Sequence, residues 1–86
     1  MIGLIYFDWK GPRGSVSEYG ELLKKGCEKT GAKFKGIYGP HNDKWNFAAI
    51  VEAEDHAGLL KAFSEAGGMH EKMPHCIFSY FTKAWP

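Results

Sequence analysis

The chain has 86 residues, enough for a single domain, 1–86, close to the lower size limit for an independently stable core. Its hydrophobic content of 44% and aromatic content of 15% argue against disorder, and its formal net charge of +1 lacks the basic excess of nucleic-acid binders. We expect no signal sequence, because the first residues lack a basic-then-apolar pattern. No apolar run is long enough to cross a bilayer, and two cysteines are too few for a disulfide framework. We therefore expect a cytoplasmic protein with reduced thiols that binds neither nucleic acid nor membrane.

The first predicted strand, residues 2–9, is apolar or aromatic on both of its faces. Successive side chains of a strand point to opposite sides, which divides this segment into two sets. Ile5, Phe7 and Trp9 share one side, and Ile2, Leu4, Tyr6 and Asp8 share the other. One layer of helices covers only one face of a sheet, so the second face must meet another subunit, a ligand or both.

A helix is predicted after a turn rich in glycine and proline. Ser15 is its expected N-cap, and Glu18 three residues later completes a capping box. Its buried stripe has three- and four-residue spacing and consists of Val16, Tyr19, Leu23 and either Gly26 or Cys27. Gly31 is a typical C-terminal stop. Gly20 and Gly26 each weaken this helix by about 1 kcal/mol relative to alanine, and we expect them to allow close approach to the sheet.

Two further strands, at about residues 32–39 and 45–53, are separated only by the turn-forming residues 40–44. Such a short connection predicts an antiparallel hairpin. Alternating lysines in the first of these strands mark it as an edge strand with one solvated side.

A second helix is predicted to begin at Asp55, its N-cap, and to end at the glycine pair 67–68. Its expected buried stripe consists of Leu59, Leu60, Phe63 and Ala66. The last strand, at about residues 75–82, is again apolar on both faces. Trp85 in the tail that follows is costly to expose, and we expect it to pack on a neighbouring subunit.

The element order is therefore βαββαβ. With right-handed crossovers, this order predicts an α+β ferredoxin-like sandwich, in which a four-stranded antiparallel sheet carries two helices on one face. The first and third strands are expected at the centre of the sheet, and the second and fourth at its edges.

Residues 5–10 (IYFDWK) and 49–55 (AIVEAED) resemble the dimeric α+β barrel superfamily, in particular its small single-domain members of unassigned activity. The resemblance covers most of the chain and consists of hydrophobic alternation followed by an acidic helix start. It implies a homodimer in which two sheets face each other and enclose a cleft. Members include isomerases, monooxygenases and degrading enzymes, but none of their catalytic motifs is matched, so no residue role carries over.

Asp8 shares the second face of the first strand with Leu4 and Tyr6. A carboxylate in a cleft walled by aromatic rings is desolvated, which raises its pKa toward values useful for proton transfer. The alternative is an ordinary solvated carboxylate at the end of a strand.

His41 lies in the hairpin connection, close in sequence to Tyr38 and Trp45. An imidazole titrates near neutrality, and aromatic neighbours bind planar ligands, so this group is a candidate site at the mouth of the cleft. The alternative is a structural turn in which Asn42 and Asp43 bond to the local backbone.

His70, His75 and Cys76 raise the question of a metal site. Because His75 and Cys76 are neighbours at the start of a strand, regular strand geometry points them to opposite faces. No zinc-binding motif is present, so we expect no cofactor and no metal site within one chain, while a metal site shared across a dimer two-fold axis stays open.

Two functions remain open. The first is a homodimer that binds a small apolar or aromatic molecule in the inter-sheet cleft, and that, as an enzyme, acts as a cofactor-independent isomerase or monooxygenase. Asp8 or His41 would then be the base and Tyr6 or Tyr38 the hydrogen-bond donor, with Tyr6, Tyr38 and Trp45 binding the ligand. The alternative is a non-catalytic dimerisation or sensor domain.

Overall fold

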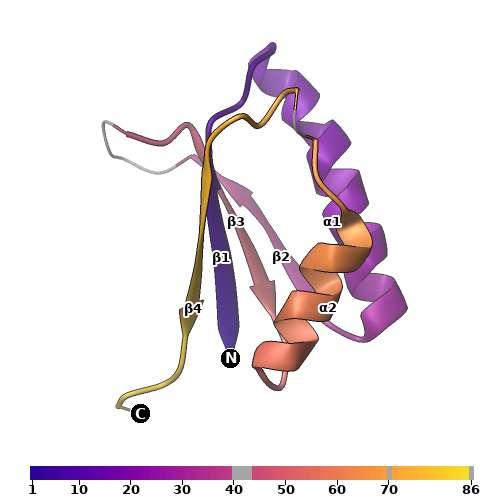
Figure 1. The fold of residues 1–86 in the computed structure, drawn as a ribbon, viewed down its shortest axis with the longest axis vertical. Helices are drawn as coiled ribbons and strands as arrows, with labels where there is room; N and C mark the ends of the chain where they lie inside the picture. The colour runs from indigo at the N-terminus through magenta and orange to yellow at the C-terminus, as the bar shows by residue number, and fades with distance from the viewer. Residues whose placement is uncertain (40–43, 70, 86) are drawn as a thin grey trace.

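The computed structural model of the chain describes residues 1–39, 44–69 and 71–85 (Figure 1). Within these residues the elements follow in the order β1 (Ile2–Phe7), the 3-10 helix η1 (Arg13–Val16), α1 (Ser17–Thr30), β2 (Lys33–Tyr38), β3 (Phe47–Glu52), α2 (His56–Ala66) and β4 (Cys76–Phe81). The predicted βαββαβ order is confirmed.

The four strands form one antiparallel sheet in the order β2-β3-β1-β4. The predicted placement of β1 and β3 at the centre, with β2 and β4 at the edges, is therefore confirmed. Both helices lie on the same side of the sheet, which gives two layers and a ferredoxin-like fold (Figure 1).

The alternation of side chains in β1 decides which of them are buried. Ile5 and Phe7 face the helices and are 1% and 0% exposed, whereas Leu4 and Tyr6 on the other face are half-buried. This confirms the predicted division of the strand into two faces. The core is completed by residues of α1, β3 and α2 and of the segments after β1 and before β4: Trp9, Tyr19, Leu23, Cys27, Phe47, Ala49, Val51, Leu59, Ala62, Phe63, Ala66 and Met73.

The start of the first helix differs from the prediction. Residues Arg13–Val16 form a 3-10 turn, and the N-cap residue of α1 makes no side-chain capping bond. Ser15 instead accepts a hydrogen bond from Nε1 of buried Trp9 at 2.9 Å and donates one to the Pro12 carbonyl at 2.6 Å. The predicted capping box is wrong because a buried indole N–H needs an acceptor and takes this hydroxyl. Glu18 forms an ion pair with a lysine instead.

The body of α1 buries Tyr19 and Leu23 of the predicted stripe and both of the alternatives Gly26 and Cys27, whereas Val16 lies in the 3-10 turn and is half-buried. The helix ends at Gly31 in a left-handed conformation with φ 80°. Gly26 was expected to lie against the sheet, but it lies against α2. A Cβ atom at this position would lie 2.8 Å from the Ala62 carbonyl oxygen and 2.9 Å from the Ala66 amide nitrogen. The missing side chain therefore lets the two helices cross in close contact.

Helix α2 begins as predicted, because the Asp55 carboxylate accepts a hydrogen bond from the Gly58 amide at 2.8 Å. It ends at Gly67, also as predicted. The prediction that Leu60 belongs to the buried stripe is wrong, because this residue is 46% exposed. It follows directly on buried Leu59 and is turned by about 100° around the helix axis, away from the core. Ala62 occupies the buried stripe in its place.

Strand β4 is apolar on both faces and exposed on both. Phe78 packs edge-on against Phe63 of α2 with ring centroids 5.2 Å apart, yet it remains 44% exposed. The strand runs along the edge of the sheet away from the helices, and the tail extends past it (Figure 1). Trp85 in this tail is 84% exposed in the single chain.

Candidate functional site

The face of the sheet turned away from the helices, which we call the open face, carries several exposed apolar side chains. Directly opposed residues share a face, so the pairing of Ile2 with Phe81 and of Tyr6 with Ile77 brings side chains of β1 and β4 together there. Ile2, Ile77 and Phe81 are 42%, 45% and 50% exposed. An extended apolar surface of this kind on one side of a small domain is typical of an interaction site.

The three aromatic residues predicted to bind a ligand, Tyr6, Tyr38 and Trp45, gather at one end of the open face, and we call them the aromatic patch. Tyr6 and Tyr38 pair with Ala48 from opposite sides, on the strands that flank it. The ring of Tyr6 stacks on that of Trp45, with centroids 6.5 Å apart and planes inclined by 24°. The hydroxyl of Tyr38 donates a hydrogen bond to the Lys35 carbonyl at 3.0 Å.

Asp8 lies just beyond the end of β1 and is half-buried. Its carboxylate accepts a hydrogen bond from the Asn46 amide at 3.3 Å, and the Asn46 side chain accepts one from the Trp9 amide at 3.2 Å. The Asp8 amide donates to the His75 carbonyl at 3.1 Å. These bonds give Asp8 a structural role in joining the ends of β1, β3 and β4. Its role as a base stays a prediction.

His41 lies outside the described residues, together with the other residues of the segment 40–43. Of the predicted group around His41, the structure describes Tyr38 and Trp45, which flank the segment 40–43.

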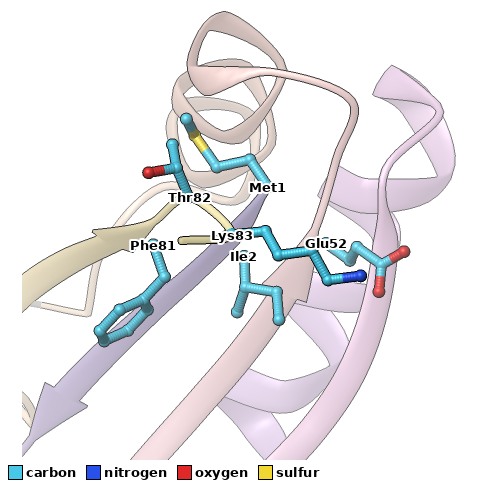
Figure 2. Close-up of a pocket in the computed structure, with 6 residues that line it drawn as sticks. All are labelled: Met1, Ile2, Glu52, Phe81, Thr82 and Lys83. Carbon is cyan, nitrogen blue, oxygen red and sulfur yellow. The ribbon is translucent and has the colours of Figure 1, made fainter. Parts of the chain in front are cut away.

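A cavity of about 360 Å³ lies at the other end of the open face, lined by Met1, Ile2, Glu52, Phe81, Thr82 and Lys83 (Figure 2). Ile2 and Phe81 give it apolar walls, while the side chain of Lys83 runs toward that of Glu52 (Figure 2). The Glu52 carboxylate also lies 3.7 Å from Nζ of Lys35 on β2. This end of the face thus combines an apolar surface with charged groups of both signs.

None of these cavity residues was selected from the sequence. The alternation that places Ile2 on the open face also places its β3 partner Glu52 there. The position of the Glu52 carboxylate on the open face can therefore be predicted once the register of β1 and β3 is known.

Among the residues that the structure describes, no group of three or more histidine, cysteine, aspartate and glutamate side chains is arranged to hold a metal ion. His70 lies outside these residues, His75 is exposed, and Cys27 and Cys76 are free thiols. Burial raises the pKa of the Cys27 thiol, which disfavours its reactive thiolate form.

No protein-family model matches the chain, and no curated protein matches it. In the described part of the chain, none of the helices has the length and apolar character needed to cross a membrane.

Proposed function

We propose that the chain forms a homodimer through its open face and binds a small apolar or aromatic molecule in the cleft between the two sheets, as in the dimeric α+β barrel superfamily. The observation that carries this proposal is the uncovered apolar surface formed by Ile2, Ile77 and Phe81. Full burial of a large aliphatic or aromatic side chain contributes about 1.5–3 kcal/mol, so the exposed half of each contributes about 1 kcal/mol on dimerisation.

A second copy of the chain is the occupant that fits this face best. The surface runs across neighbouring strands, and the charged groups at its end are of both signs, Glu52 with Lys35 and Lys83. A two-fold axis brings identical apolar patches together without opposing like charges over a large area. Trp85, which is 84% exposed in the tail after β4, would give the partner a further apolar anchor.

Two features of the open face support a ligand in the cleft. The aromatic patch offers π-faces to a planar molecule, and the cavity at Ile2 and Phe81 offers an apolar wall with Lys83 and Glu52 at its side. The class of ligand that fits both is a small, largely apolar molecule that carries one polar or charged group.

If the cleft is catalytic, the reaction is cofactor-independent proton transfer or oxygenation, with Asp8 or His41 as the base. Asp8→Asn preserves the hydrogen bond from Asn46, because the amide oxygen accepts in place of the carboxylate. This variant therefore separates the structural role of Asp8 from proton transfer. The catalytic role is rejected if both Asp8→Asn and His41→Ala turn over a substrate at the wild-type rate.

The dimer is tested with two matched substitutions, Ile77→Lys and Leu60→Lys. The two side chains are 45% and 46% exposed, but Ile77 lies on the open face and Leu60 on α2 in the opposite layer. In a two-fold interface the substituted lysine is buried once from each subunit. If each burial costs about 2 kcal/mol, the dissociation constant of the dimer rises about a thousandfold. We expect a monomer from Ile77→Lys and an unchanged dimer from Leu60→Lys, measured by light scattering after gel filtration. Equal behaviour of the two variants would contradict the proposed interface.

Ligand binding is tested by fluorescence titration with anilinonaphthalene sulfonate, an aromatic anion. We expect saturable binding to the dimer that is lost in Trp45→Ala and kept in Trp85→Ala.

The non-catalytic alternative has its own support. The polar groups of Tyr38 and Asp8 already bond within the chain, which suits an interface filled by side chains. It predicts a stable dimer with no saturable binding of the dye.

A further inference from the structure

A second cavity, of about 130 Å³, lies on the helix side of the sheet, and three sulfur-bearing side chains line it: Met69, Met73 and Cys76. The remaining walls are mainly apolar and include Ile5 and Phe63. The cavity is separated from the open face by the sheet itself. It takes no part in the function proposed above.

The backbone directs all three sulfur side chains toward this cavity. The Met73 amide donates to the Met69 carbonyl at 2.8 Å, a bond with the i to i+4 spacing of a helical turn. This bond holds the two residues together, and both line the cavity. Cys76 is the first residue of β4 and pairs with fully buried Phe7, so it faces the helix side.

A polar group also reaches this cavity. Tyr19 is 2% exposed and lines the cavity. Burial raises the pKa of Tyr19, and the nearby Cys76 raises it further. Tyr19 thus places a hydroxyl-bearing side chain near Cys76 in the wall of the cavity.

We propose that this cavity binds one Cu(I) ion through the thiolate sulfur of Cys76 and the thioether sulfurs of Met69 and Met73. Thiolate and thioether ligands select soft metal ions such as Cu(I). On binding, the Cys76 thiol releases its proton to solvent and the S–Cu bond forms, with no change in oxidation state. The thiolate cancels the single charge of the ion, so the complex is neutral and suits an apolar cavity. A divalent ion such as Zn²⁺ would leave an uncompensated positive charge there, and it favours cysteine, histidine and carboxylate ligands over thioethers.

In the sequence, the nitrogen and thiol donors near this position, His75 and Cys76, are neighbours on the predicted strand and are expected to point to opposite faces. The two methionines carry no metal-binding motif of their own. Their spacing, Met69 to Met73 followed by Cys76, becomes informative once the turn between them is known.

The test is a competition between the full-length protein and bicinchoninate for Cu(I) under reducing conditions. The variants are Cys76→Ser, the double variant Met69→Leu with Met73→Leu, and the control Cys27→Ala. Methionine to leucine nearly conserves volume, so the double variant is expected to fold, which circular dichroism checks. We expect one Cu(I) per chain, at least about tenfold weaker binding for each lost donor, and unchanged binding in the control.

The chain supplies an internal control as well, because its third methionine, Met1, lies outside this cavity. Addition of Ag(I) should shift the NMR signals of the Met69 and Met73 methyl groups and leave that of Met1 unchanged. Wild-type affinity in the double methionine variant, loss of binding in Cys27→Ala, or equally tight binding of Zn²⁺ would each overturn the proposal. None of these outcomes bears on the dimer, which is measured by mass alone.

Discussion

Two glycines of α1 provide a direct test of the packing, because the same substitution is expected to have opposite effects at the two positions. A Cβ atom at Gly26 would lie 2.8 Å and 2.9 Å from backbone atoms of α2, which have no rotamer to move into. A Cβ atom at Gly20 would meet only the end of the Ile37 side chain, at an ordinary contact distance of 3.5 Å.

The magnitudes follow from these contacts. Alanine in place of glycine stabilises a helix by about 0.5–1 kcal/mol, and this is the whole effect expected for Gly20→Ala. At Gly26 the same gain is opposed by overpacking, which costs about 1–3 kcal/mol, so Gly26→Ala is expected to destabilise by about 1 kcal/mol. The two variants should therefore differ by about 2 kcal/mol, or about 8–16 °C in Tm for a domain of this size.

The assay is urea denaturation of both variants and the wild type at one protein concentration, because unfolding of a dimer depends on concentration. An unchanged m-value shows that only stability has changed. If both variants are stabilised equally, α1 and α2 do not cross at Gly26 as described.

Three further predictions concern single groups. Ser15→Ala removes the acceptor of the buried Trp9 indole and should cost about 1–3 kcal/mol of unfolding free energy in urea, whereas Ser17→Ala, with an exposed hydroxyl, should cost close to nothing. Asp55→Ala removes the N-cap of α2 and should lower stability by about 1 kcal/mol, while Glu54→Ala serves as a neighbouring control without a capping bond. Burial raises the pKa of Tyr19, so the folded state holds the phenol proton more tightly than the unfolded state does. The free energy of unfolding should therefore fall as the pH rises above about 10, by at most about 1.4 kcal/mol per pH unit. The comparison uses Cys27→Ala alone and Cys27→Ala with Tyr19→Phe, because burial also raises the pKa of the Cys27 thiol and its titration would overlap. Tyr19→Phe should abolish the decline in stability between pH 9 and 11.

Most of the fold follows from local patterns in the sequence. The alternation in β1, the cap at Asp55 and the stops at Gly31 and Gly67 depend on residues close to one another along the chain. The errors arose where a distant residue decides the outcome. Ser15 has the sequence context of an N-cap, but the Trp9 indole takes its hydroxyl, and no local pattern indicates that Gly26 meets α2.

The site was predicted less completely than the fold. The alternation of side chains in β1 predicted that Tyr6 lies on the open face. The predicted hairpin brought Tyr38 and Trp45 together at one end of the sheet. The cavity at Ile2 and Glu52 depends on the register between strands far apart in sequence, which the pattern alone does not specify.

The account depends most on the claim that a second copy of the chain covers the open face. Sedimentation equilibrium of the unmodified protein at micromolar concentration measures this directly. The predicted result is a single species of about twice the chain mass of 9.6 kDa. A species of 9.6 kDa with no concentration dependence would contradict the interface and the cleft proposed within it.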